Sequence, residues 1–182
     1  MLSIRYYGDP ILRKTAQPIE VFDDELRLFV DDMVVAMKHY DGVGLAAPQV
    51  GRSVRCVAMD TTGGVEKPLV LINPECTFAS EETVQHEEGC LSFPDIDLKV
   101  TRPAIVSVKA FDELGREFMI TVAEDLLSRA LQHEIDHLNG IMIIDHVSLL
   151  QRKLLKRKLK KISELNNGEP EPESDTPPED KL

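Results

Sequence analysis

The sequence predicts an α+β fold in which antiparallel sheets pack around a central helix, with a further helix near each end of the chain. Two observations predict it. Helical periodicity occurs in one early segment and two late ones, while the middle of the chain carries short alternating or β-branched runs. The long alternation of strands and helices that builds a parallel sheet is absent. The chain has 182 residues, of which 42% are apolar, enough for one hydrophobic core.

The first predicted element is an amphipathic helix over residues 23 to 40. Its apolar side chains recur at spacings of three and four, and Asp23 or Asp24 is available as the N-cap. This stripe would bury one face of the helix. The apolar residues are Leu26, Phe29, Val30, Met33, Val34 and Met37.

The middle of the chain predicts four strands. They are the runs at residues 54 to 59, 69 to 72, 105 to 111 and 117 to 122, which Gly, Pro and Asp clusters separate. Residues 111 to 117 (FDELGRE) have the composition of a turn. The last two strands should therefore form an antiparallel hairpin.

Two helices and a tail complete the predicted fold. The central helix, from about residue 124 to 138, ends at Asn139 and Gly140, a C-cap signal. The next, residues 147 to 165, has leucines on one side and seven basic side chains on the other. Residues 166 to 182 contain four prolines and six acidic residues, which predicts a disordered tail after one folded domain, residues 1 to 165.

Charge and composition exclude several classes of protein. The formal net charge is -11 at pH 7, although residues 151 to 165 carry seven basic side chains and one acidic. The acidic body argues against DNA binding, and affinity for a polyanion should be confined to the basic stretch. No apolar run approaches the length of a membrane span, and the start lacks a secretory signal. We therefore expect a cytoplasmic protein without a membrane partner.

Residues 133 to 137 (HEIDH) place a metal-binding motif on the central helix. At about 100° per residue, His133, Glu134 and His137 share one arc of the helix, so two imidazoles can bind one metal while the carboxylate stays free to take a proton from water. Such a motif also occurs by chance on helix surfaces. Here the apolar residues that flank it on both neighbouring stripes indicate that it faces the core, where unpaired polar groups would be costly.

Two residues are candidates for the third protein ligand of the metal. The extended motif with a third downstream histidine fails, because Ile143 stands at that position. Cys90, in a segment bracketed by Gly and Pro (EGCLSFP), offers a thiol that a metal would deprotonate, and His86, four residues earlier, competes with it. Cys56 and Cys76 are expected to be buried, inert thiols.

Residues 42 to 51 (GVGLAAPQVG) form a loop of small residues after the first helix. Gly and Ala let a backbone approach a ligand closely, and the side-chain amide of Gln49 can donate to a developing oxyanion. Without a preceding strand and a following helix, the glycine pattern is poor support for a nucleotide site. The loop supports the prediction of a functional site only in combination with the HEIDH and EGCLSFP motifs.

Taken together, three motifs resemble the signature of the peptide deformylases. They are GVGLAAPQ at residues 42 to 49, EGCLS at 88 to 92 and QHEIDH at 132 to 137, in this order. The similarity extends from the DPILR segment at residues 9 to 13 to about residue 165. The tail has no counterpart expected in the family.

The resemblance implies an enzyme that removes the formyl group from the N-terminal formyl-methionine of nascent polypeptides and releases formate. Cys90, His133 and His137 would ligate one divalent metal, in the family usually Fe(II), and the central helix would be its binding helix. A site of one thiolate and two imidazoles also accepts Zn, Ni or Co. Glu134 would act first as base and then as acid.

The same resemblance implies the contacts to substrate. The side-chain amide of Gln49 and the backbone N–H of Leu91 would hold the oxyanion. The backbone of Val43 and Gly44 would pair with the peptide. The methionine pocket would be lined by apolar residues such as Leu126 and Ala130.

The resemblance also implies a contact between the basic helix, residues 151 to 163, and the ribosome, where nascent formylated polypeptides emerge. The alternative is a solvated helix face. Two other functions compete with the deformylase assignment: a metallohydrolase for a different acyl group, and a catalytically silent homologue that only binds ribosomes. The complete set of site side chains disfavours the second.

Overall fold

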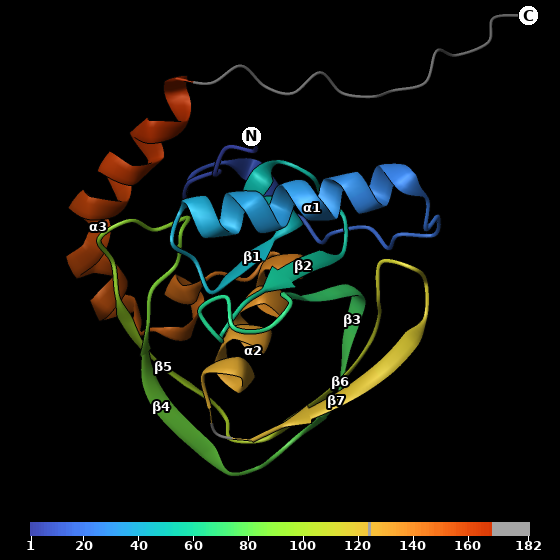
Figure 1. Ribbon diagram of the computed structural model, residues 1–182. Helices are drawn as coiled ribbons and strands as arrows, with labels where there is room; N and C mark the ends of the chain where they lie inside the picture. Colours follow the sequence, from blue (N-terminus) through green and yellow to red (C-terminus); the bar gives the residue numbers. More distant parts are fainter. Residues whose placement is uncertain (124, 169–182) are drawn as a thin grey trace, which may run out of the picture.

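The computed structural model describes residues 1–123 and 125–168, and its sheets enclose a central helix (Figure 1). The strands are β1 (Gly44–Ala46), β2 (Cys56–Met59), β3 (Leu69–Ala79), β4 (Thr83–Glu88), β5 (Leu98–Pro103), β6 (Val106–Phe111) and β7 (Glu117–Val122). An antiparallel five-stranded sheet has the order β1-β2-β3-β6-β7, and β4 pairs with β5. The helix α2 (Leu126–Leu138) lies between the two sheets. The predicted α+β class is confirmed.

All three predicted helices are present, because each has both a side-chain cap and an apolar face to bury. The helices α1 (Asp24–His39) and α3 (Leu149–Ser163) flank the body of the molecule, and α1 packs on β1 and β2. Asp23, Asp125 and Ser148 each accept a hydrogen bond from a backbone N–H three residues further on. The predicted boundaries differ from these by a few residues, and residue 124, the predicted start of α2, lies outside the described residues.

The four predicted strands correspond to β2, β3, β6 and β7, and the hairpin between the last two is confirmed by the N–H of Asp112 donating to the Arg116 carbonyl at 3.0 Å. The strand β3 runs on to Ala79 through a bulge that the sequence pattern did not predict. Three strands were missed. The strand β1 is only 3 residues of small and apolar type, and β4 has a polar sequence, TVQHEE, in which every second residue from Thr83 to Glu87 is exposed.

The face of α2 that carries the metal-binding motif points into the core, as the sequence predicts. Leu131 and Leu138 are buried against β2, β3 and β6, while His133 and His137 are also buried, at 8% and 1% exposure. A separate cluster joins the segment after β4 to α3 through Phe93, among others. The elements that carry the three sequence motifs are therefore packed into one body.

The end of α3 is tied to the N-terminal segment. A short 3-10 helix, η4 (Glu164–Gly168), follows α3, and the side-chain amide of Asn166 both accepts from the Tyr6 N–H and donates to the Tyr6 carbonyl, each at 3.0 Å. Asn166 is the first residue of the predicted tail, and the tail's residues 169 to 182 lie outside the described part of the chain. In that described part, no helix has the length and apolar character needed to cross a membrane.

Candidate metal centre and active site

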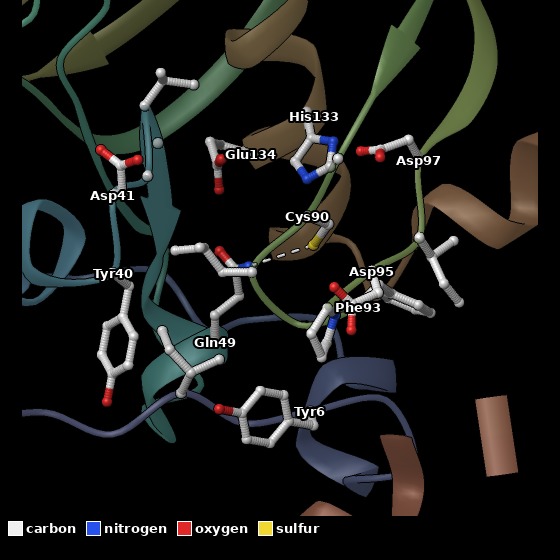
Figure 2. A pocket seen from close by; sticks show the side chains of 18 residues that line it. Tyr6, Tyr40, Asp41, Gln49, Cys90, Phe93, Asp95, Asp97, His133 and Glu134 are labelled. Carbon is white, nitrogen blue, oxygen red and sulfur yellow. Dashed lines mark hydrogen bonds between the residues drawn. The ribbon is translucent and has the colours of Figure 1, made fainter. Parts of the chain in front are cut away.

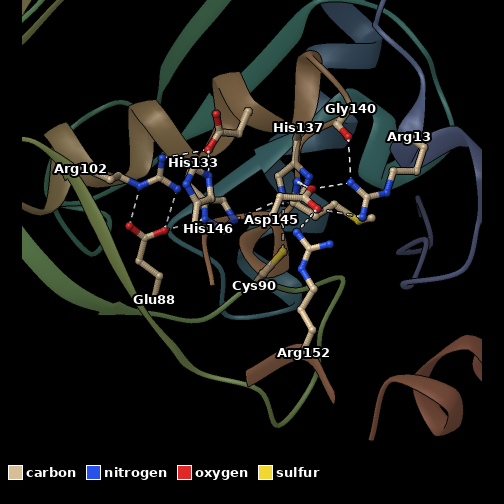
Figure 3. A network of polar contacts seen from close by, with 12 residues as sticks. Arg13, Glu88, Cys90, Arg102, His133, His137, Gly140, Asp145, His146 and Arg152 are labelled. Carbon is tan, nitrogen blue, oxygen red and sulfur yellow. Dashed lines mark hydrogen bonds and ion pairs between the residues drawn. The ribbon is translucent and has the colours of Figure 1, made fainter. Parts of the chain in front are cut away.

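Three metal-binding side chains meet beside α2 (Figure 3). Cys90 Sγ lies 3.3 Å from His137 Nε2, which lies 3.2 Å from His133 Nε2, and the three ligand atoms all lie within 4.8 Å of one another. The two facing ring nitrogens can share at most one proton, whereas a divalent cation can bind both rings and the sulfur together. The donor set therefore fits a metal ion.

A helix turn and a strand end bring these ligands together. His133 and His137 lie one turn apart on α2, and burial lowers the pKa of His137 well below its usual value, so its ring stays neutral and able to bind a metal. Cys90 follows the end of β4, where its carbonyl accepts from the Phe93 N–H at 2.8 Å. His86 lies within β4 opposite Val100 and is not part of the group.

A buried ion-pair network orients the first histidine (Figure 3). His133 Nδ1 lies 3.1 Å from Glu88 Oε2, and both oxygens of Glu88 accept from Arg102, at 2.6 and 2.9 Å. Arg102 also donates to Asp136 at 2.9 Å, and Asp136 lies 2.8 Å from His146 Nε2. Burial alone would raise the pKa of Glu88, but the hydrogen bonds from His133 and Arg102 lower it to about 2. An ionised Glu88 holds His133 with Nε2 facing the other ligands.

Sequence reasoning missed this network. Glu88 stands inside the EGCLS motif, two residues before Cys90, so its place next to the ligands was a usable signal. Arg102 and His146 carry no such signal, because β5 and the segment after α2 bring them to the site from elsewhere in the chain.

Glu134 is a buried carboxylate at the edge of the same group. It is only 4% exposed, and its Oε2 has no hydrogen-bond partner among the described residues. Burial raises the pKa of Glu134 to about 7, so the group can exchange a proton near neutral pH. Gly44 makes room for it, because a Cβ at that position would collide with the Glu134 carboxylate.

Gln49 is held with its amide nitrogen toward Cys90 (Figure 2). Its Oε1 accepts from the Ala46 N–H at 2.8 Å, while its Nε2 lies 3.2 Å from Ser92 Oγ and 3.6 Å from Cys90 Sγ. The side chain is 1% exposed. The loop of small residues at 42 to 51 is therefore an ordered wall, formed by β1 and the 3-10 helix η2 (Ala47–Val50), that fixes an amide donor beside the ligands.

A cavity of about 520 Å³ opens on this group (Figure 2). Seven of the predicted site residues line it: Val43, Gly44, Gln49, Cys90, Leu91, His133 and Glu134. His137 lies behind them as the most buried ligand. Leu126 and Ala130, predicted for the methionine pocket, do not line this cavity. Leu126 is 41% exposed at the first turn of α2, and Ala130 packs in the core with Leu131.

The other two cysteines lie apart from the group. Cys56 is fully buried in β2, where burial raises the pKa of its thiol to about 12, which makes it inert as predicted. The prediction that Cys76 is buried is wrong, because the bulged half of β3 that carries it is exposed.

Two imidazoles and a thiol grouped for one cation, beside a buried carboxylate and a substrate-sized cavity, define a metal-dependent hydrolase. The family model described as polypeptide deformylase matches residues 1–153, and the chain belongs to this family. The family consists of metal-dependent enzymes that hydrolyse the formyl group from the N-terminus of polypeptides.

The relatives cover nearly the whole described chain. This chain is 47% identical to the peptide deformylase of Thermotoga petrophila over 163 residues, and the match covers 90% of this chain and 97% of the relative. It is 43% identical over 157 residues to that of Brucella suis, 85% of this chain and 89% of the relative. The crystal structure of a peptide deformylase from Legionella pneumophila superposes with a TM-score of 0.85 at 42% identity, covering 93% of this chain and 99% of the other.

Proposed function

We propose that this protein removes the formyl group from the N-terminal formyl-methionine of nascent polypeptides in the cytoplasm, with Cys90, His133 and His137 as the protein ligands of one Fe(II) ion. The observation that carries the proposal is the grouping of these three side chains at one cavity beside the carboxylate of Glu134, whose buried Oε2 has no hydrogen-bond partner among the described residues. A divalent metal in this site supplies Lewis acidity toward water and the formyl oxygen.

The chain's own residues divide the remaining work. Glu134 takes a proton from the attacking water and delivers it to the departing amine, a role that suits a carboxyl whose pKa is raised to about 7. The fixed amide of Gln49 and the N–H of Leu91 donate to the oxygen of the formyl group as it becomes negative. The edge of β1 at Val43 and Gly44 pairs with the peptide backbone. The methionine side chain reaches past the residues that line the main cavity to the first half of α2, at Leu126 and Ala130.

The experiment that tests this function is formate release by anaerobically purified protein with known metal content. We expect turnover of a formyl-Met peptide and a loss of at least about a hundredfold with the matching acetyl-Met peptide, because a site shaped for hydrogen on the acyl carbon excludes a methyl group. Equal rates on both peptides would identify a different amide hydrolase. We expect iron as the bound metal, and a preparation active only with zinc would contradict the Fe(II) assignment.

We propose further that the basic helix, residues 151 to 163, contacts ribosomal RNA. Lys156, Arg157 and Lys160 are exposed on α3, away from the catalytic cavity. Reversing all three to Glu should lower co-sedimentation with ribosomes by about tenfold at low salt, and the difference should shrink as ionic strength rises. Turnover of a formylated tripeptide should not change, since α3 lies outside the site.

The matched control reverses three exposed lysines elsewhere, Lys14, Lys67 and Lys99, and should leave ribosome binding close to that of the wild type. We infer that residues 1 to 165 form the catalytic domain, so removing residues 169 to 182 from either variant should not alter tripeptide turnover. Equal co-sedimentation of the α3 variant and the wild type at low salt would show that the helix is a solvated surface.

A further inference from the structure

The N-terminal segment at residues 4 to 7 forms part of the wall of the catalytic cavity. Ile4 and Tyr6 line the cavity, and Figure 2 shows Tyr6 among the side chains that surround it. This segment belongs to neither of the two sheets. Its position therefore depends on the hydrogen bonds that it makes with other parts of the chain.

On one side, the segment bonds to the backbone of two residues of the site. The Arg5 N–H donates to the Gln49 carbonyl at 2.7 Å, and the Tyr7 N–H donates to the Ser92 carbonyl at 2.9 Å. Ser92 Oγ in turn lies 3.2 Å from Gln49 Nε2, the amide that we expect to hold the oxyanion. The segment therefore supports both residues that set the direction of this amide.

On the other side, one side chain holds the same segment. The Asn166 amide accepts from the Tyr6 N–H at 3.0 Å, and it donates to the carbonyls of Tyr6 and Tyr7 at 3.0 and 3.2 Å. The N–H groups of Arg5 and Tyr7 thus face the site, while the N–H of Tyr6 between them faces Asn166. These bonds connect the end of α3 with the wall of the cavity.

The turn after this segment packs closely on the end of α3. Gly8 has a φ of +104°, and a Cβ at that position would come within 2.6 Å of Ser163 Cβ. The ring of Tyr7 contacts that of Phe93, next to Ser92, with the ring centroids 5.4 Å apart. Without the Asn166 amide, three part-buried backbone groups would have to exchange their bonds to it for bonds to water, which requires the segment to move outward.

We propose that Asn166 is a positioning residue for the reaction, which acts through residues 5 to 7 to hold the Gln49 amide in place. This inference rests on the proposed function. Asn166 neither lines the cavity nor belongs to the metal-binding group, so its loss should lower kcat by only about fivefold, whereas direct loss of an oxyanion donor costs about a hundredfold or more. We expect KM to stay within about twofold, because the amide acts on charge that develops in the transition state.

The test compares two asparagines that bind the backbone in the same way. Asn73 Oδ1 accepts from the Ile19 N–H at 2.8 Å, and Asn73 Nδ2 donates to the Ile19 carbonyl at 2.7 Å, away from the cavity. Asn→Asp at either position keeps the acceptor and replaces the donor by an oxygen that the carbonyls repel. Both variants should therefore lower the melting temperature, but only Asn166→Asp should lower kcat for formyl-Met-Ala-Ala, at unchanged metal content.

A double variant shows whether the effect passes through Gln49. Gln49→Leu removes the amide and should lower kcat by about a hundredfold. In that background, Asn166→Asp should lower kcat by less than about twofold more, because the group that it positions is gone. Two effects that simply multiply would contradict the proposal. If Asn166→Asp does not fold, Asn166→Ala, which adds no charge, should lower kcat in the same way and decides alone.

Turnover by the wild type separates this inference from the proposed function. If the wild type releases formate and the Asn166 variants keep its kcat, the positioning role is overturned while the function stands. The same conclusion follows if Asn73→Asp lowers kcat as much as Asn166→Asp, because lost stability would then explain both. If the wild type with its metal releases no formate, the proposed function fails and this inference fails with it.

Discussion

Replacing Glu134 by Gln is expected to lower kcat/KM for a formylated tripeptide by at least about a hundredfold. The amide is nearly the same size as the carboxyl, so it fits the space that Gly44 leaves, but it cannot accept a proton from water. Metal content should stay that of the wild type, because Cys90, His133 and His137 are untouched. Formate release and metal analysis of the same preparation measure both quantities.

Stability provides the control for that variant. Oε2 of Glu134 is buried without a hydrogen-bond partner in the part of the chain that the structure describes. Removing the carboxyl therefore deletes a group whose burial is itself unfavourable, and the melting temperature should be unchanged or higher. Glu87→Gln, an exposed change on β4, should leave activity intact. Turnover near that of the wild type with full metal occupancy in Glu134→Gln would remove Glu134 from the mechanism.

The helices were predictable because their apolar residues repeat with the helical period and each begins at a side-chain cap. The same periodicity placed His133, Glu134 and His137 on one arc, since residues one and four positions apart on a helix have a fixed angular relation. The strands β4 and β5 were not predictable on that basis. They form a two-stranded sheet whose outer side chains are solvated, so β4 in particular lacks the apolar alternation that identifies a strand.

The third metal ligand could not be identified from the local sequence pattern, because its position depends on the tertiary structure. Spacing along the chain could not separate Cys90 from His86, since both precede His133 by more than 40 residues. Pairing of β4 with β5 settles their positions, because it holds His86 within the strand and brings Cys90, just beyond the strand end, to the histidines. The role of Arg102 could not be predicted from the sequence either, because its partners Glu88 and Asp136 come from β4 and α2.

Replacing Arg102 by Met is expected to destabilise the protein by about 3–5 kcal/mol, the usual cost of leaving a buried charge without its partner. The side chain of Arg102 is 5% exposed. Its removal leaves the carboxylate of Glu88, which is 7% exposed, without its ion-pair partner, and it also removes the ion pair with Asp136. The melting temperature should fall by about 10 °C or more for a domain of this size. Chemical denaturation of the metal-loaded protein measures the change in unfolding free energy.

A second substitution distinguishes lost ion pairing from lost packing. Glu88→Gln combined with Arg102→Met leaves no carboxylate in that pair, so the double variant should cost less than the sum of the two single variants, with a coupling of about 1–3 kcal/mol. Arg116→Met removes a cation of similar shape from a surface pair with Asp112, where the side chain is 72% exposed, and should cost about 1 kcal/mol or less. Strictly additive effects of Glu88→Gln and Arg102→Met would show that the two side chains stabilise the fold independently. In that case Arg102 would not be the residue that keeps Glu88 ionised and aimed at His133.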